Sequence, residues 1–194
     1  MPLSKEAVAD TRQLLQDLAS QPPSAWSARS EVPIQDTIFA FCDSAGENEE
    51  DIKSAGAAWI YEHKASEINW TRIDWTADEL RQHSTHLETL NGLRTCQAIM
   101  RQRPHVKCIV EVYDSQAAVA ILRRLSSRDP NLNKLMRERI DLQTQYPELC
   151  FMTLWEDRET GFIANLLSKH EDHKARFELA KRFPNRKLAS VKWT

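Results

Sequence analysis

The sequence has few glycines, few cysteines and no long apolar run. Four scattered glycines in 194 residues cannot form a Gly-rich phosphate-binding loop. The four cysteines, at positions 42, 96, 108 and 150, include no C-x-x-C pair and lie in or beside apolar segments, which indicates buried thiols rather than zinc ligands or disulfides. No apolar stretch reaches the ~20 residues of a membrane span, and the N-terminus lacks a signal-peptide core. We therefore expect an intracellular protein, cytoplasmic or nuclear, with no membrane partner.

The composition is that of a soluble globular protein with one well-packed domain. Hydrophobic residues make up 41% of the chain and charged residues 28%. An amphipathic segment over residues 4–20 predicts a helix, and the Pro/Ser-rich stretch after it reads as a linker. The predicted organisation is an N-terminal helix and linker over 1–34, a domain over 35–183 and a tail over 184–194. The N-terminal helix offers a contact for a protein partner.

Charge is segregated along the chain although the net charge is only −2. Residues 43–51 hold five acidic and no basic residues, whereas residues 115–146 hold six basic residues against three acidic ones. The six basic residues could bind the phosphates of a nucleic acid, with solvated helix faces as the alternative; they are Arg123, Arg124, Arg128, Lys134, Arg137 and Arg139.

Hydrophobic periodicity predicts a mixed α/β protein. Short apolar or alternating runs predict five strands, over 37–43, 54–63, 68–75, 106–113 and 149–155. Repeats of three to four residues predict helices over 85–103, 115–126, 129–146 and 162–183. Three successive strands with short turns favour an antiparallel meander, and the later alternation of strand and helix favours a mixed sheet with helices on both faces.

Three apolar runs each carry one carboxylate at the edge, in the order Asp43, Glu88, Asp114. Each has a local explanation: Asp43 as a turn residue, Glu88 as the partner of Thr85 in a capping box, and Asp114 as a helix N-cap. Asp43 and Asp114, however, end strands predicted to be central, and Glu88 lies in the first turn of the connecting helix. All three can therefore converge on one edge of the sheet, where three carboxylates would hold divalent metal ions.

With these motifs in this order the chain resembles the ribonuclease H family, in motif style most closely the domains associated with reverse transcriptases. The matching segments are FCDS at 41–44, LETL at 87–90 and YDSQ at 113–116. The resemblance covers about residues 35–183 and implies a ribonuclease H-like fold with a five-stranded mixed sheet.

The resemblance also implies a function. The expected activity is metal-dependent endonucleolytic cleavage of the RNA strand of RNA-DNA hybrids, with two Mg²⁺ ions, or Mn²⁺, as cofactors. Asp43 would bridge the two ions, and Glu88 and Asp114 would hold one each. By the same resemblance, the residues expected to touch the nucleic acid are Ser44, Ser84, Thr85 and Gln116.

The last helix departs from the family pattern. The family has an aspartate in a segment of the form Ala-Asp-x-Leu-Ala-Lys, whereas this chain has ANLLSK at 164–169, so Asn165 would be the fourth metal ligand and a weaker one. A second register places FELAK, 177–181, on the pattern. Asp157, Glu159 or Asp172 could also supply the missing ligand in space. The Gly-His pair often found before this helix is absent as well.

Two other functions remain open from the sequence. The irregular fourth ligand is consistent with a non-catalytic ribonuclease H-like module that binds nucleic acid or protein. The intact three acids are also consistent with a nuclease of other specificity on the same fold.

Overall fold

Six strands form one mixed sheet in a computed structural model, which describes residues 32–46, 55–159 and 161–191. The sheet order is β5-β4-β1-β2-β3-β6. The strands are β1 (Thr37–Ser44), β2 (Ala55–Glu62), β3 (Glu67–Asp74), β4 (Cys108–Tyr113), β5 (Cys150–Trp155) and β6 (Lys187–Ser190). The first three are antiparallel, β4 and β5 run parallel to β1, and β6 runs parallel to β3.

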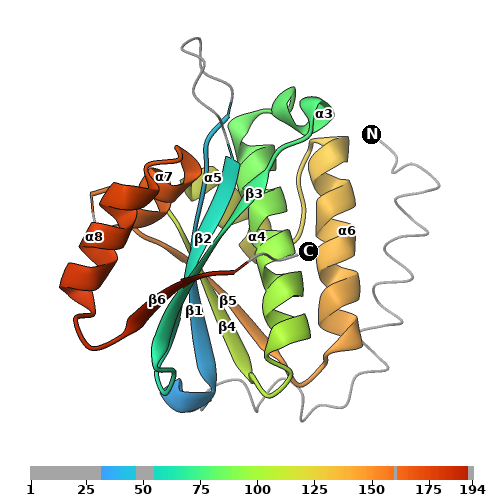
Figure 1. Cartoon of the computed structure of the whole chain (residues 1–194). Helices are drawn as coiled ribbons and strands as arrows, with labels where there is room; N and C mark the ends of the chain where they lie inside the picture. Colours follow the sequence, from blue (N-terminus) through green and yellow to red (C-terminus); the bar gives the residue numbers. More distant parts are fainter. Residues whose placement is uncertain (1–31, 47–54, 160, 192–194) are drawn as a thin grey trace, which may run out of the picture. The chain divides into compact units, whose positions relative to one another are not determined.

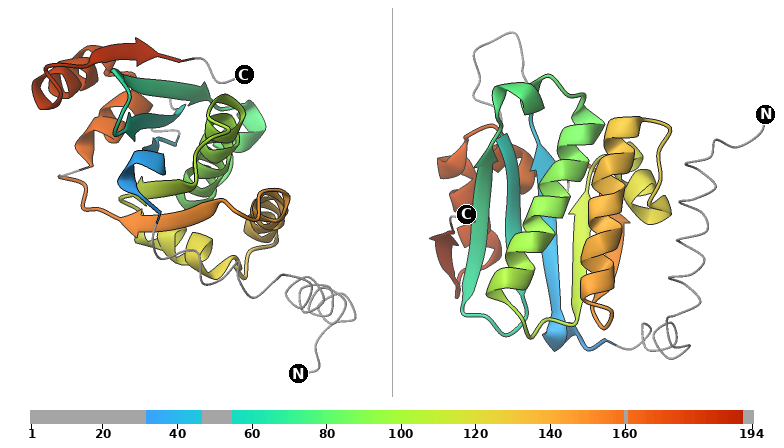
Figure 2. Two further views of the ribbon diagram at one scale, coloured as in Figure 1. Left: turned by 90° about the horizontal axis from the view of Figure 1, so that it is seen from below. Right: turned by 90° about the vertical axis from the view of Figure 1, so that its right-hand side faces the viewer.

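Helices cover both faces of this sheet (Figures 1 and 2). The helices are η2 (Ile34–Asp36), α3 (Ala77–Leu80), α4 (Ser84–Gln102), α5 (Gln116–Arg124), α6 (Pro130–Gln145), α7 (Phe162–Ser168) and α8 (Asp172–Arg182). In the part of the chain that the structure describes, no helix is long and apolar enough to cross a membrane. Most of the predicted N-terminal helix and linker, residues 1–31, lies outside the described residues.

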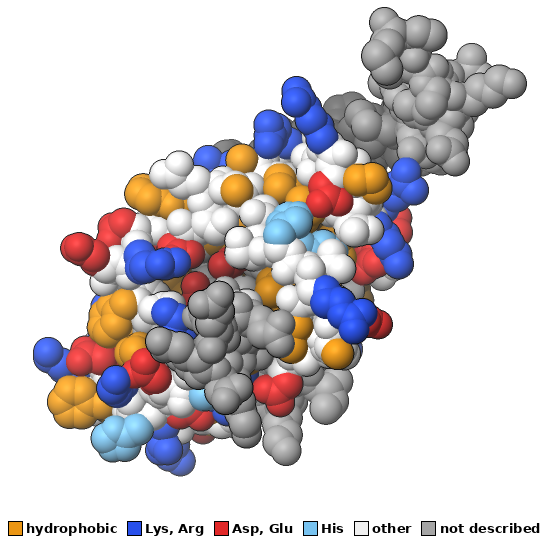
Figure 3. Space-filling view, turned by 90° about the horizontal axis from the view of Figure 1, so that it is seen from above, with side chains coloured by type: hydrophobic (Ala, Val, Ile, Leu, Met, Phe, Trp, Pro, Cys, Tyr) orange, Lys and Arg blue, Asp and Glu red, His pale blue; other side chains and the backbone are white. Residues whose placement is uncertain are grey.

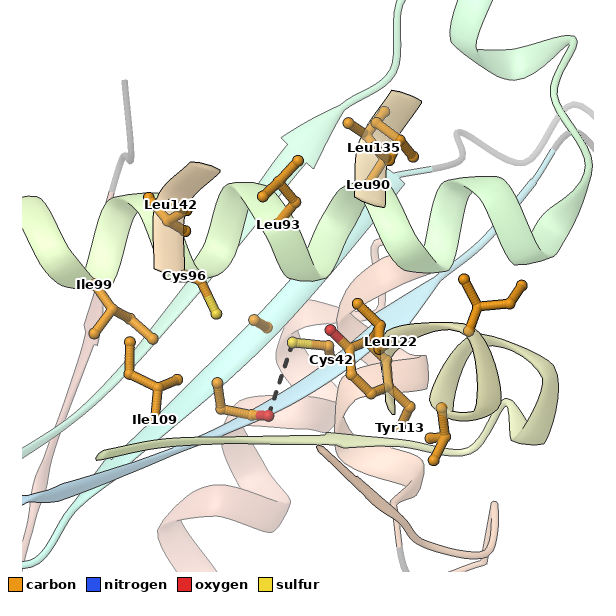
Figure 4. Close-up of a cluster of buried hydrophobic side chains, with 14 of the residues drawn as sticks. Cys42, Leu90, Leu93, Cys96, Ile99, Ile109, Tyr113, Leu122, Leu135 and Leu142 are labelled. Atoms are coloured by element: carbon orange, nitrogen blue, oxygen red, sulfur yellow. Dashed lines mark hydrogen bonds between the residues drawn. The ribbon is translucent and has the colours of Figure 1, made fainter. Parts of the chain in front are cut away.

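The two faces have separate apolar cores. Alternate residues of β1 point to opposite faces, so Ile38, Ala40 and Cys42 join the core under α4, α5 and α6. Phe41 packs instead with the core of β2, β3, α7 and α8. Figure 4 shows the Cys96 side chain of α4 directed toward Cys42 in the sheet. Asp43 follows the same alternation, which places it on the face that α7 covers.

A buried ion pair fastens α6 to the sheet. Arg139 of α6 pairs with Glu111 of β4, and both side chains are almost fully buried. Tyr113 donates a 2.9 Å hydrogen bond to the other Glu111 oxygen, and the Arg139 guanidinium lies 4.1 Å from the centre of the Phe151 ring. The prediction that Arg139 belongs to a phosphate-binding surface is therefore wrong, because the Arg139 guanidinium is buried and paired with Glu111.

Gly92 allows α4 to lie this close to β4. A Cβ atom at this position would come within 1.6 Å of the Tyr113 hydroxyl oxygen and 3.0 Å of Glu111 Oε1. Any side chain at position 92 would thus displace the group that hydrogen-bonds to Glu111.

The mixed sheet was predicted, but the sheet has six strands in the described residues and not five. The additional strand, β6, pairs with β3 through residues of the predicted tail. It is only four residues long and has no fully buried residue, so it carries too little apolar alternation to be detected from the sequence.

The helix predicted over residues 162–183 is two helices, α7 and α8. His170 adopts a left-handed conformation with φ of 60°, and its N–H donates to the Leu167 carbonyl while the N–H of Glu171 donates to the Leu166 carbonyl. These two bonds are the Schellman pattern that ends a helix. The apolar positions continue in α8, which explains why periodicity alone predicts a single helix.

Candidate metal centre

The structure brings Asp43, Glu88 and Asp114 together. The parallel strands β1 and β4 are neighbours, so Asp43 near the end of β1 and Asp114 just after β4 lie at the same edge of the sheet. Glu88 reaches this edge from the second turn of α4. One carboxylate oxygen from each residue lies within 4.8 Å of the others. Figure 3 views this end of the molecule and shows acidic side chains partly recessed near the middle of the face, with Lys and Arg side chains both beside them and at the rim.

None of the three acids has the local role that could have explained it. Asp43 lies within β1, paired opposite Ala57, and not in a turn. The N-cap of α4 is His83, whose side chain accepts from the His86 N–H, so Glu88 is not part of a capping box with Thr85. The N-cap of α5 is Ser115 and not Asp114.

Electrostatics at the cluster disfavours three ionised carboxylates without a cation. Burial raises the pKa of Asp43, the hydrogen bond from Ser168 lowers it, and the charge of Asp114 raises it further. Burial raises the pKa of Glu88 well above its usual range, and the charges of Asp43 and Asp114 add to this effect. Divalent ions would offset the repulsion.

The donor set fits a hard divalent cation. Magnesium and manganese ions prefer carboxylate oxygens, and these residues offer three on one edge. Glu88 Oε2 is buried and has no hydrogen-bond partner among the described residues. A buried carboxylate oxygen without a partner is energetically unfavourable, because nothing compensates for its desolvation. A bound cation would remove this cost.

Two buried polar residues hold Asp43 in place, and sequence reasoning missed both. The hydroxyl of Ser168, in α7, donates to Asp43 Oδ2. The side-chain amide of Asn91, in α4, donates to the backbone carbonyls of Asp43 and Ala57, at 3.0 and 2.9 Å. Asn91 thereby links β1, β2 and α4 next to the acidic cluster. Its position four residues after the first turn of a helix gives no signal in the sequence.

The role of Asn165 as a fourth metal ligand remains a prediction. Asn165 lies in α7 and is partly exposed. Its backbone carbonyl oxygen lies 3.0 Å from the Ser168 hydroxyl oxygen. The α7 residue that contacts the acidic cluster is Ser168, which lies three residues after Asn165 and donates a hydrogen bond to Asp43. Of the alternative ligands, Asp172 forms an ion pair with Arg72 of β3, and neither Asp157 nor Glu159 belongs to the three-member acidic group found among the described residues.

Arg158, in the segment between β5 and α7, was not predicted as a site residue. Its Nε lies 2.8 Å from Asp114 Oδ2. The Arg158 side chain is 72% exposed, whereas that of Asp114 is 13% exposed. Trp155 also contacts Asp114, because the Trp155 indole N–H donates to the Asp114 backbone carbonyl at 3.0 Å.

The four predicted nucleic-acid contacts lie within four residues of one of the three acids in the sequence, and their role stays a prediction. Ser84 and Gln116 are exposed, and Thr85 is partly exposed. Gln116 lines an open pocket of about 260 Å³ together with Trp155 and other residues of α5. The Ser44 hydroxyl already donates to the Leu87 carbonyl at 3.1 Å, which ties β1 to α4.

No family model matches the sequence, and no curated protein matches it. Solved structures do match. The RNase H1 of the halophilic archaeon Halobacterium salinarum NRC-1 is 16% identical, with a TM-score of 0.50 over 73% of this chain and 98% of that one. LC11-RNase H1, isolated from compost by a metagenomic approach, is 13% identical, with a TM-score of 0.50 over 71% of this chain and 98% of that one.

The prototype foamy virus protease-reverse transcriptase shows a weaker likeness, with 11% identity and a TM-score of 0.40; the match covers 79% of this chain and 19% of that one. The two RNase H1 structures confirm, at the level of the fold, the resemblance inferred from the three motifs. The chain has a ribonuclease H-like fold with one added strand, β6.

Proposed function

We propose that this protein is a metal-dependent endonuclease that hydrolyses the RNA strand of RNA-DNA hybrids. The observation that carries the proposal is the convergence of Asp43, Glu88 and Asp114 within 4.8 Å, with one buried Glu88 oxygen unpartnered. The ribonuclease H-like fold supports the reaction class, although a fold by itself does not define an activity.

Each residue of the centre has a proposed role. Asp43, Glu88 and Asp114 would hold two divalent ions, and Asn165 is the candidate further ligand. When bound, divalent ions at such a site activate water near neutral pH and stabilise the leaving oxygen of a phosphodiester. Ser168 and Asn91 keep Asp43 oriented through its side chain and its backbone.

Substrate choice is proposed to depend on duplex shape and on the 2′-hydroxyl groups of the RNA strand. Ser84 and Thr85 precede Glu88 by one turn of α4, Gln116 follows Asp114 by two residues, and all three offer exposed or partly exposed polar side chains. Ser44 would have to give up its hydrogen bond to the Leu87 carbonyl in order to donate to a nucleic acid, so its proposed role is the weakest of the four.

Asp43→Asn tests the proposal. We expect the wild-type protein with Mg²⁺ or Mn²⁺ to cleave the RNA strand of a hybrid in preference to duplex RNA and single-stranded RNA. Asp43→Asn should lower this activity at least about 100-fold, since even the partners of metal ligands contribute about 10- to 100-fold. Asp78→Asn, at an exposed acid of α3, is the matched control and should retain full activity.

A non-catalytic nucleic-acid-binding or protein-interaction module is the second candidate, favoured by the neutral side chains Asn165 and Ser168 on α7. Hybrid binding without cleavage under any metal condition would support the binding module. Cleavage that persists in Asp43→Asn would contradict the assignment of the site.

A further inference from the structure

A basic side chain lies at the acidic centre and has no place in the proposed two-ion arrangement. Arg158 Nε lies 2.8 Å from Asp114 Oδ2. The pKa of Arg158 is raised first by its hydrogen bond to Asp114 and by the charge of that residue, and further by Asp43 and Glu88. The contact at 2.8 Å places the guanidinium directly against one of the three acids, Asp114.

The residues that α7 presents here are neutral. Ser168 donates to Asp43, and Asn165 is the residue that the ANLLSK register aligns with the aspartate of the family pattern. The charged groups in direct contact here are thus the three carboxylates and one permanently charged guanidinium, and the charge of Lys169, just after α7, also acts on Asp43. One divalent ion together with Arg158 balances the charge of three carboxylates. Two divalent ions together with Arg158 leave the centre with excess positive charge, which opposes binding of the second ion.

We propose that Arg158 takes the place of the second cation, so that the protein works with one divalent ion and one guanidinium. This inference rests on the proposed nuclease function and deepens it. Asp114 fixes the guanidinium through Nε, and the side chain is 72% exposed, so its remaining N–H groups can meet a phosphodiester. A guanidinium binds two phosphate oxygens at once, and it stabilises negative charge that develops on them.

Counting bound Mn²⁺ tests this directly, by electron paramagnetic resonance of free Mn²⁺ in titrations of the full chain. We expect one Mn²⁺ per wild-type chain and none at this site in Asp43→Asn. Arg158→Ala should bind the first ion about fivefold or more tightly, because a like charge has been removed, and should take up a second ion at higher concentration. Arg158→Lys keeps the charge and should still bind one.

Hybrid cleavage provides the second measurement. Arg158→Ala should lower kcat at Mn²⁺ concentrations that fill one site, and should recover part of the loss where the second ion binds. Arg81→Ala is the matched control, because Arg81 also pairs with an aspartate, Asp78, on the exposed surface. It should resemble the wild type in ion number, affinity and kcat.

Two Mn²⁺ ions bound to the wild-type protein would overturn the inference, as would an Arg158→Ala variant indistinguishable from Arg81→Ala. The nuclease proposal fails separately. If the wild type binds one ion, Arg158→Ala binds two, and neither cleaves any nucleic acid, the assignment of Arg158 stands and the activity does not.

Discussion

Two hydrogen bonds fix the position of Asp43, and we expect both of them to contribute to its affinity for a metal ion. Its side chain accepts the hydroxyl of Ser168 and its carbonyl accepts the amide of Asn91. A carboxylate whose position is fixed in this way does not have to be ordered when the ion binds, which favours affinity.

Removal of the Ser168 hydroxyl tests the side-chain hold. In Ser168→Ala the Asp43 carboxylate loses its hydrogen-bond donor, so its pKa should rise further and its affinity for Mn²⁺ should fall about 10-fold or more. Calorimetric titration with Mn²⁺ measures the change. An affinity equal to that of the wild type would show that Ser168 does not position Asp43.

The raised pKa values of Asp43 and Glu88 predict an unusual pH dependence for the metal-free protein. Both groups bind protons more tightly in the folded state than in the unfolded state, so their contribution to stability is present at low pH and is lost as pH rises through the folded pKa. With a chelator present, the Tm should therefore fall as the pH rises from the usual range of carboxyl pKa values to and beyond the raised pKa values of the two groups.

Two measurements separate this effect from the rest of the molecule. Glu88→Gln should flatten the fall in Tm, because one of the repelling charges is absent. Saturating Mn²⁺ should raise the Tm more at pH 8 than at pH 5, since protons and metal compete for the same oxygens. Equal Mn²⁺ stabilisation at both pH values would contradict a carboxylate site.

At the scale of elements, the buried Glu111–Arg139 ion pair links α6 to β4. Removing one partner leaves an uncompensated buried charge, so Glu111→Leu or Arg139→Met alone should cost about 3–5 kcal/mol of unfolding free energy. The double variant should cost much less than the sum, because neither charge remains. Urea unfolding of the four proteins gives the coupling energy. Additive losses would show that the pair is not coupled.

The elements differ in how well their sequences predict them. The period of α4 and the β-branched and aromatic runs of β1 and β4 predict these elements closely, because each buries a continuous apolar face. The end of α7 depends on two backbone hydrogen bonds around His170, and β6 depends on the exposed edge of β3. Neither feature changes the hydrophobic pattern, so neither was predicted.

For the whole molecule, the topology explains why three acids distant in sequence meet. Parallel pairing of β1 with β4 brings Asp43 and Asp114 to one edge, and α4 crosses that edge with Glu88. The sequence predicts this convergence because each acid ends or begins an apolar run. Arg158, Ser168 and Asn91 were missed because their contacts join segments that only the tertiary fold brings together.

The most direct test of the acidic centre is anomalous diffraction from crystals grown with Mn²⁺. The account predicts an anomalous peak within coordination distance of oxygens from Asp43, Glu88 and Asp114, with the Glu88 oxygen that otherwise lacks a partner among its ligands. Crystals that contain Mn²⁺ elsewhere but show no peak between these three carboxylates would contradict the assignment of a metal centre.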